Sequence, residues 1–236
     1  MSLVIPVYNE IGALPGLIAE IREALDHYDA TYEVVLVDDG STDGSGEWLD
    51  LRASEDPRIR PVHFVRNAGQ SAAFAAGFVA ATGDIVVTLD ADGQNPPIEI
   101  PKLLDAFRGG SADVVAGYRL GRKDTLWRRF QSRLANGVRN RLTGETIRDT
   151  GCSLKAFRAN LLRSIPLYQG MHRFLPTLCR LAGAERVIEV GVAHRERTTG
   201  VSKYGMWNRA WRSFVDLLAV RWMQKRWIRY EVRHDA

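Results

Sequence analysis

The chain has 236 residues, 45% of them hydrophobic, which is enough for one large α/β domain with a sizeable core. Its net charge of +4 conceals an asymmetry, because residues 1–118 carry 7 Lys and Arg against 19 Asp and Glu, and residues 119–236 carry 25 against 9. The two cysteines form no C-x-x-C pair and no apolar window of about 18 residues occurs, so we expect neither a disulfide framework nor a membrane-spanning helix, and reduced thiols in a cytosolic compartment.

Strand-like and helix-like segments alternate through the acidic half. Apolar runs predict strands at 3–7, 33–37, 59–65, 85–89 and 114–118, and helical spacing predicts helices at 13–27, around 48–51, at 71–81 and at 98–107. This order implies right-handed crossovers and a mainly parallel sheet flanked by helices. Ligands of such sheets bind outside the carboxyl ends of the strands.

Polar side chains directly follow three of these strands. They are Tyr8, Asn9 and Glu10 after the first strand, Asp38 and Asp39 after the second, and Asp90 and Asp92 after the fourth. We therefore expect all of them to share one crevice at the edge of the sheet.

Asp90 and Asp92 lie one residue apart at the end of an apolar strand. Because side chains alternate between the faces of a strand, both carboxylates point the same way. With the amide oxygen of Gln94 nearby, they suit a hard cation that takes oxygen ligands and also accepts substrate phosphate oxygens. Asp and Gly after a strand also fit an ordinary turn, so the pattern gains weight only from other motifs.

The basic half is less regular. Helices are expected at 125–143, 160–165 and 171–181, strands at 153–157 and 185–195, and loops at 148–152 and 198–203. His63, His172 and His194 have no metal-ligand spacing among them, and we interpret them as structural.

A final helix is expected at 204–227, with large apolar side chains along one stripe. The stripe comprises Trp207, Trp211, Phe214, Leu218 and Trp222. Either it packs on the core of the protein, or it lies in the plane of a membrane surface, where Trp and flanking Lys and Arg favour the headgroup region. Basic residues at positions 225, 226, 229 and 233 favour the membrane, because anionic lipids attract such clusters.

Five motifs together resemble the family 2 inverting glycosyltransferases. They are residues 6–10 (PVYNE), 37–44 (VDDGSTDG), 66–69 (RNAG), 90–94 (DADGQ) and 200–203 (GVSK), in this order along the chain. Within the family, the sequence is similar to the branch of dolichyl-phosphate mannosyltransferase and the bacterial polyprenyl-phosphate glycosyltransferases. Many bacterial members of that branch end in transmembrane helices, a pattern that this sequence does not show.

The resemblance implies a GT-A fold, a Rossmann-like α/β arrangement, with a nucleotide-sugar donor (a GDP- or UDP-sugar), a polyprenyl phosphate acceptor and Mg²⁺ or Mn²⁺ as cofactor. Carried over to this sequence, the nucleotide pocket would contain Pro6, Tyr8, Glu10, Asp38 and Asp39, and the metal site Asp90, Asp92 and Gln94. Contacts to the donor diphosphate and the acceptor phosphate would come from Arg119, Arg128, Ser132, Arg173, Arg197, Ser202 and Lys203.

The implied chemistry is displacement at the anomeric carbon of the donor sugar. A cation held by Asp90 and Asp92 would stabilise the charge of the leaving diphosphate. A lipid phosphate is already anionic and needs no general base. Arg119, Arg197 and Lys203 would therefore act by neutralising and aiming it.

Two alternatives remain open from the sequence. If the acceptor were a saccharide hydroxyl, a general base would be required, and Asp149 is the candidate. The basic half also fits a nucleic-acid-binding protein, although the acidic half would repel phosphate and no recognised nucleic-acid motif is present. We therefore expect a transferase without a nucleic-acid partner.

The expected organisation is one glycosyltransferase domain over residues 1–200, followed by an amphipathic membrane-interface segment over 201–236. Within the domain, residues 1–118 form the acidic donor and metal half, and residues 119–200 the basic acceptor half. Such a protein would lie peripherally on the cytoplasmic face of a membrane. A homo-oligomer or a membrane-protein partner is compatible with the Trp-rich terminal helix.

Overall fold

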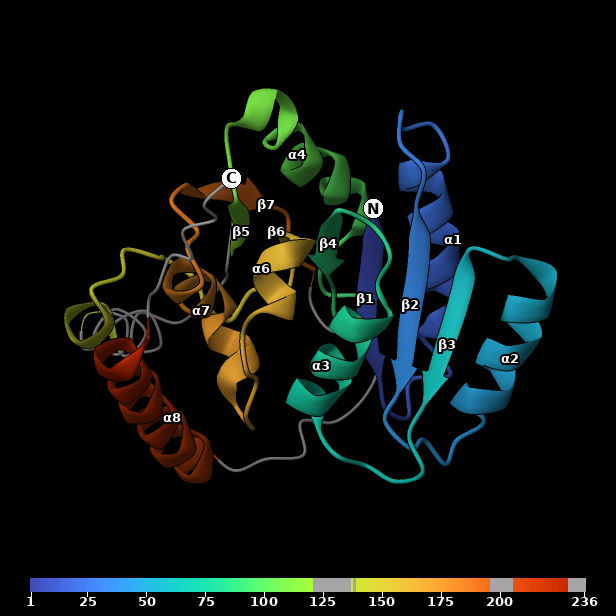
Figure 1. Ribbon diagram of the computed structural model, residues 1–236. Coiled ribbons are helices and arrows are strands. Elements are labelled where there is room, and N and C mark those ends of the chain that lie inside the picture. Colours follow the sequence, from blue (N-terminus) through green and yellow to red (C-terminus); the bar gives the residue numbers. More distant parts are fainter. Residues whose placement is uncertain (121–136, 138, 196–205, 229–236) are drawn as a thin grey trace, which may run out of the picture.

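A mixed β-sheet organises the computed structural model, which describes residues 1–120, 137, 139–195 and 206–228 (Figure 1). Its strands are β1 (Ser2–Val7), β2 (Glu33–Asp38), β3 (Ile59–His63), β4 (Ile85–Thr88), β5 (Val114–Arg119), β6 (Lys155–Arg158) and β7 (Val187–Val192). Within the described ranges they form one seven-stranded sheet in the order β3-β2-β1-β4-β6-β5-β7.

The predicted mainly parallel arrangement is confirmed. Strands β3, β2, β1 and β4 pair in parallel, and so do β5 and β7. The exception is β6, which lies antiparallel between β4 and β5. Strand β6 belongs to the basic half of the chain, but both of its neighbours come from the acidic half. One neighbour, β4, ends at the expected metal site, and the other, β5, ends at Arg119.

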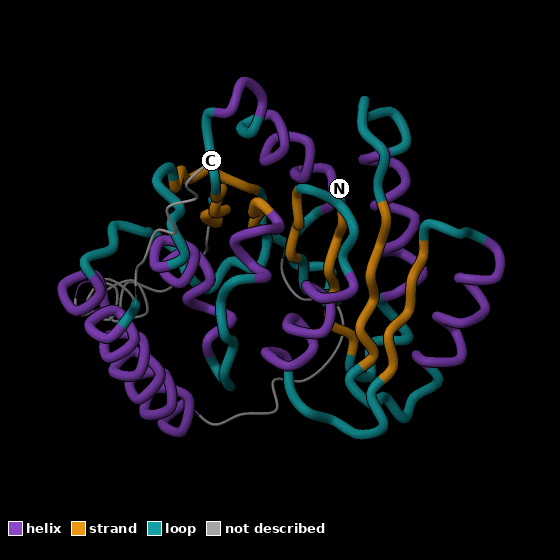
Figure 2. Tube along the Cα trace, viewed as in Figure 1, coloured by secondary structure: helices purple, strands orange, loops and turns teal. Residues whose placement is uncertain are grey.

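Helices cover both faces of the sheet (Figure 2). They are α1 (Leu14–Leu25), α2 (Ser45–Glu55), α3 (Gln70–Ala80), α4 (Ile100–Asp105), α6 (Ala159–Arg163), α7 (Leu175–Leu181) and α8 (Met206–Arg226), with 3-10 turns η1 (Pro97–Glu99), η2 (Arg108–Gly110) and η3 (Met171–Phe174). The single helix predicted at 98–107 is divided into η1 and α4, with a proline in the first turn of each, where its missing N–H costs no hydrogen bond. Most of the helix predicted at 125–143 lies outside the described residues.

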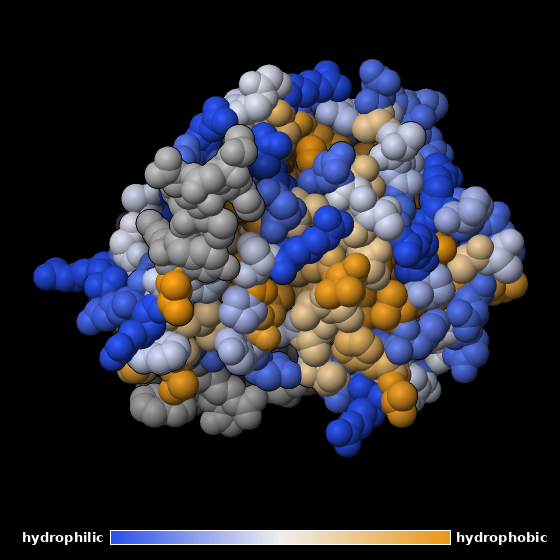
Figure 3. Space-filling view, viewed as in Figure 1, coloured by the Kyte–Doolittle hydropathy of each residue, from blue (hydrophilic) through white to orange (hydrophobic). Residues whose placement is uncertain are grey.

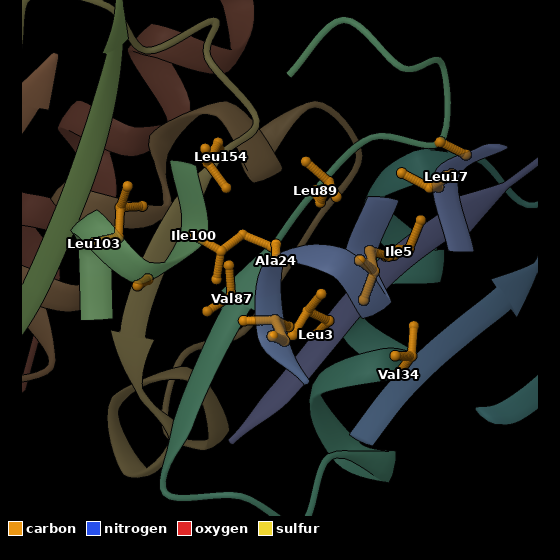
Figure 4. Packing of buried hydrophobic residues seen from close by; sticks show 14 of the residues in the cluster. Leu3, Ile5, Leu17, Ala24, Val34, Val87, Leu89, Ile100, Leu103 and Leu154 are labelled. Carbon is orange, nitrogen blue, oxygen red and sulfur yellow. The ribbon is translucent and has the colours of Figure 1, made fainter. Parts of the chain in front are cut away.

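Two hydrophobic cores lie on opposite faces of the sheet. Leu3, Ile5 and Val7 of β1 point to the face covered by α1 and α4, where Leu17 and Ile100 also pack (Figure 4). The intervening Val4 faces α3 in the second core, which α6, α7 and α8 complete. The alternation follows from the pleat of the strand, and it buries β1 on both faces of the sheet.

Helix α8 has two apolar sides. Its inner side contributes Leu217, Val220 and Met223 to the second core. Phe214, Leu218 and Trp222 of the predicted stripe are 41, 46 and 64% exposed, so this part of the stripe does not pack on the core. The side chains of Trp207 and Trp211 lie outside what the structure describes. Among the described residues, no helix combines the length and apolar character needed to span a bilayer.

Gly77 allows α3 to approach the sheet closely. A Cβ at this position would lie 2.3 Å from Cγ1 of Val4 and 3.2 Å from Cγ2 of Val37, both of which are fully buried.

We predict that Gly77→Ala lowers the free energy of unfolding by about 1–3 kcal/mol through overpacking, measured by urea denaturation. The control is Gly16→Ala in α1, where the added methyl meets nothing within 4 Å and should stabilise the helix by about 0.5–1 kcal/mol. Equal effects of the two substitutions would contradict this account.

Candidate active site

The carboxyl ends of β2, β1 and β4 bring three polar loops to one edge of the sheet. The three strands are adjacent and parallel, so the segments that follow Val7, Asp38 and Thr88 leave the sheet on the same side. A backbone hydrogen bond from Asp39 N to Val7 O (2.8 Å) joins the first two directly. The predicted convergence of these loops is therefore confirmed.

The loop after β1 is fastened to the loop after β2. Asn9 adopts a left-handed conformation (φ 56°), and its side-chain oxygen accepts a hydrogen bond from Thr42 N (2.8 Å), while its own N–H donates to Ser41 Oγ (3.0 Å). Asp43 accepts from Ile11 N (3.1 Å). Burial acts to raise the pKa of Asp43, but hydrogen bonds from Ser45 and the Ile11 backbone hold it below its usual value. Residues 41–45 thus act as a scaffold for the 8–11 loop, a role that the sequence pattern did not reveal.

Asp39 points into the protein. It is 3% exposed, and its carboxylate accepts hydrogen bonds from Ala68 N (2.6 Å), Gly69 N (2.9 Å) and Asn67 Nδ2 (2.9 Å). The carboxylate expected to bind nucleotide therefore shapes the 67–69 loop. The neighbouring Gly40 is required there, because at φ 70° a Cβ would lie 2.7 Å from the Arg66 carbonyl carbon.

Asp38 is also engaged within the protein. Its Oδ1 accepts a hydrogen bond from Ser41 N (2.9 Å), and its Oδ2 lies 3.1 Å from Nδ1 of His63. His63 Nε2 lies 3.0 Å from Oδ1 of Asp50 in α2. His63 thus bridges two carboxylates, which agrees with its predicted structural role.

The pair Asp90 and Asp92 follows β4, as predicted. Asp90 Oδ1 accepts a hydrogen bond from Gln70 Nε2 (2.7 Å), and Asp90 N donates to Ser153 Oγ (3.2 Å). Asp92 Oδ1 accepts from Gln94 N (3.2 Å) within its own turn. One carboxylate is therefore held from distant parts of the chain, and the other is held locally.

Burial and the nearby charge of Asp92 both disfavour ionisation of Asp90. Burial and the negative charge of Asp92 raise the pKa of Asp90 to about 6, against the opposing effects of Ser153, Lys155 and Gln70. Lys155 is buried in β6, where its ammonium donates to the backbone carbonyls of Thr150 (3.3 Å) and Cys152. Burial lowers the pKa of Lys155. A cation placed at Asp90 and Asp92 would relieve the repulsion.

The donor set fits a hard divalent cation. Among the described residues, no group of three or more His, Cys, Asp or Glu side chains could hold a metal ion, so a site for zinc built from protein ligands alone is not found there. Two carboxylates and the amide of Gln94 suit Mg²⁺ or Mn²⁺, which complete their coordination with water and substrate phosphate. The backbone of Gln94 is fixed from both sides, by Asp92 and by Arg195 N, which donates to Gln94 O (2.8 Å).

Arg119 and Asp149 form a bidentate ion pair at the end of β5. Arg119 Nε donates to Asp149 Oδ2 (2.7 Å) and its Nη2 to Oδ1 (2.9 Å), and Gly151 N also donates to Oδ1 (3.1 Å). Asp149 would have to break this pair to act as a general base. The geometry therefore favours an orienting role for Asp149 over the catalytic role considered from the sequence.

Other expected phosphate contacts are engaged by another helix or lie outside the described residues. Arg173 in η3 donates through Nη1 to Ser213 Oγ of α8 (2.9 Å), so it joins that helix to the domain. Arg128, Ser132, Arg197, Ser202 and Lys203 lie outside the described residues, as does the polar loop predicted at 198–203. The described chain reaches Arg195 beside Gln94 immediately before that loop.

A comparison with known protein families identifies the family of this chain. The family described as "Glycosyl transferase family 2" matches residues 2–165. The chain belongs to glycosyl transferase family 2. The predicted family is confirmed. The predicted branch within the family also agrees with the names of the curated relatives described next.

Curated relatives act on polyprenyl phosphates by name. The chain is 44% identical over 207 residues to an undecaprenyl-phosphate 4-deoxy-4-formamido-L-arabinose transferase of Aeromonas hydrophila, a match that covers 87% of this chain and 63% of the relative. It is 37% identical over 238 residues to a dodecaprenyl-phosphate galacturonate synthase of Rhizobium johnstonii, covering 99% of this chain and 68% of the relative. The chain thus spans about two thirds of the length of these family 2 proteins.

Solved structures confirm the expected GT-A-like fold of this family 2 member. Glucosyl-3-phosphoglycerate synthase from Mycobacterium tuberculosis, in complex with Mn²⁺, UDP and phosphoglyceric acid, matches with a TM-score of 0.69 and 22% identity over 94% of this chain and 77% of that one. A mannosyltransferase from Pyrobaculum calidifontis, in complex with GDP-mannose and Mn²⁺, matches with a TM-score of 0.65 and 23% identity over 95% and 63%.

Because His63 lies between the carboxylates of Asp38 and Asp50, we expect its contribution to the stability of the fold to depend on pH. Burial acts to lower the pKa of His63, but hydrogen bonds to Asp38 and Asp50 raise it above its ordinary value. Only the protonated ring donates to both carboxylates, so the stabilisation is complete below the unfolded-state pKa, near 6.5, and is lost as the pH rises through the higher folded-state pKa.

We predict that the difference in unfolding free energy between the wild type and His63→Gln, measured by urea denaturation, is largest at about pH 6 and declines toward about pH 8. Asp50→Asn, which removes the negative charge of one of the two carboxylates, should flatten this dependence. A difference that is constant across the range would contradict the bridge.

Proposed function

We propose that this chain catalyses metal-dependent, inverting transfer of a hexose from a nucleotide sugar to a polyprenyl phosphate at a membrane surface. The observation that carries the proposal is the repelling pair Asp90 and Asp92 at the carboxyl end of β4 in a family 2 fold. Relatives named for undecaprenyl and dodecaprenyl phosphates support the acceptor class. Structural neighbours with Mn²⁺ and either UDP or GDP-mannose support the donor class.

Asp90, Asp92 and Gln94 would hold Mg²⁺ or Mn²⁺, which when bound neutralises the charge of the leaving diphosphate. The protein prepares this position by fixing Asp90 through Gln70 and Gln94 through its backbone. Donor-site residues then only need to orient the nucleotide.

The nucleotide pocket would be formed by the ends of β1 and β2. Tyr8 is 40% exposed directly after β1, where its ring can stack on a base, and Pro6 and Glu10 flank it. Asp38 and Asp39 would support this pocket indirectly. Asp38 accepts a hydrogen bond from the backbone of Ser41, and Asp39 accepts one from the backbone of Ala68. Their contribution is therefore rigidity of the pocket wall, which keeps the base and ribose in register with the metal.

The acceptor phosphate would be bound from the basic side. Asp149 fixes the orientation of the Arg119 guanidinium, which lies at the end of β5 in the same sheet edge as the carboxylates. Arg197, Ser202 and Lys203 follow Arg195, whose backbone is bonded to Gln94, so the chain leads from the metal site into this motif. Arg128, Ser132 and Arg173 remain proposed contacts to phosphate groups. An acceptor that is already anionic needs no base, which agrees with the pairing of Asp149.

The exposed side of α8 would attach the protein to the membrane. Phe214, Val215, Leu218 and Trp222 share this side with the exposed Arg221, Lys225 and Arg226. Hydrophilic and hydrophobic side chains are accordingly mixed over α8 in Figure 3. Aromatic and basic groups on one side of a helix favour the headgroup region of anionic bilayers. Peripheral attachment would bring the active site to its lipid substrate.

The function is tested by incubating the protein with UDP- and GDP-sugars and polyprenyl phosphate, with Mg²⁺, with Mn²⁺ or with EDTA, and measuring glycolipid formation. We predict transfer only with metal, and a loss of about 100-fold or more in Asp92→Ala, the scale of removing one preorganised electrostatic group. Asp29→Ala, an exposed Asp beyond the opposite end of β2, should retain full activity. Metal-independent transfer, or full activity of Asp92→Ala, would refute the metal mechanism; nucleotide release without glycolipid would refute the lipid acceptor.

The membrane role of α8 is tested by sedimentation with vesicles of phosphatidylcholine and phosphatidylglycerol. Replacing Leu218 and Trp222 by Ser should reduce binding about tenfold or more, because burying each large apolar side chain in the interface contributes about 1.5–3 kcal/mol. The matched control is Leu51→Ser, since Leu51 is equally exposed on α2 at the opposite edge of the molecule (Figure 1). Unchanged partitioning of the double variant would exclude this face as the membrane contact.

A further inference from the structure

The two carboxylates of the metal site are supported unequally. Asp92 accepts a hydrogen bond from Gln94 N, two residues farther along the same turn. Asp90 is contacted from α3 by Gln70 and from the segment before β6 by Ser153, which lie 20 and 63 positions away in the sequence. Ser153 Oγ also accepts from Asn95 Nδ2 (2.8 Å), so this support is itself fixed. Asp90 is therefore the preorganised member of the pair.

Gln70 also connects two functional loops. It is the first residue of α3, directly after the 67–69 segment, of which all three residues donate hydrogen bonds to Asp39. From this position its side-chain amide reaches Asp90 Oδ1 at 2.7 Å. One residue thus joins the loop behind the nucleotide pocket to the carboxylate of the metal site.

The chemistry of this contact favours metal binding. The amide N–H of Gln70 donates to Asp90 Oδ1 at 2.7 Å, which fixes the direction in which this carboxylate points. This hydrogen bond to Oδ1 restricts the rotation of the Asp90 side chain, a freedom that cation binding would otherwise have to remove. Partners that orient metal-binding carboxylates in this way commonly contribute 10- to 100-fold to metal affinity.

We propose that Gln70 is a positioning residue of the metal site, which orients Asp90. This inference rests on the metal-dependent function proposed above. Gln70 is solvent-exposed, so its replacement opens no cavity in the core. Its effect can therefore be measured in a folded protein.

The test measures Mn²⁺ binding to the full chain in the presence of UDP and, separately, of GDP. Electron paramagnetic resonance reports the concentration of free Mn²⁺ in each titration. Gln70→Met keeps the length of the side chain and removes the donor, and should weaken Mn²⁺ binding by about 10- to 100-fold. The control is Gln169→Met, which removes a hydrogen bond of 2.5 Å from Gln169 Nε2 to Ala68 O in the same loop but makes no contact with Asp90. This variant should bind Mn²⁺ like the wild type.

The outcomes separate this inference from the function on which it rests. Wild-type affinity in Gln70→Met, or equal weakening in Gln169→Met, overturns the positioning role while leaving the metal site in place. Absence of Mn²⁺ binding by the wild type with either nucleotide overturns both the inference and the proposed function.

A second measurement requires no metal. In metal-free protein, urea unfolding of Gln70→Met, Asp90→Asn and the double variant forms a double-mutant cycle. We expect a coupling between the two positions, with Gln70→Met costing less stability once Asp90 is neutral. Additive effects would show that the hydrogen bond does not constrain Asp90 and would overturn the proposal.

Discussion

The placement of two carboxylates, Asp90 and Asp92, at the end of β4 is the constraint around which the candidate active-site edge is arranged. Parallel strands deliver their following residues to one edge, so an acidic half of the chain inevitably gathers carboxylates there. Folding is compatible with this only if most of them are neutralised by donors. Asp38, Asp39 and Asp43 are satisfied by backbone N–H groups, hydroxyls and His63. The pair after β4 is the place where the negative charge remains concentrated, which is the property that a cation site needs.

Strand β6 explains how the basic half contributes to this edge. By pairing antiparallel with β4 and β5, it brings Ser153 and Lys155 next to Asp90 and places the segment before it beside Arg119. Lys155 is buried, and its ammonium donates a hydrogen bond to the carbonyl of Thr150, the residue after Asp149. Acidic and basic halves of the sequence are therefore interleaved in space, and the candidate site lies where their charges meet.

The sequence predicted the elements and their convergence well, because apolar runs and strand order determine them locally. The loops after β1, β2 and β4 meet as expected, and Asp90 and Asp92 occupy the end of β4. The inward direction of Asp39 could not be predicted, since it depends on donors in the 67–69 loop, about 30 residues away. The pairing of Arg119 with Asp149 depends in the same way on the antiparallel course of β6, for which the short run at 153–157 carries no signal.

Helix α8 shows why a single apolar stripe is an incomplete description of a helix. Periodicity identified Phe214, Leu218 and Trp222, yet the core is filled by Leu217, Val220 and Met223, and both sets follow helical spacing. Only the partner surface decides which set is buried. Here that partner includes η3, and Gly170 before η3 lets α8 approach so closely that a Cβ there would lie 2.1 Å from Asp216 Oδ2. Since Gln169, the next residue toward the N-terminus, donates to Ala68 O, the segment that packs against α8 also contacts the 67–69 loop.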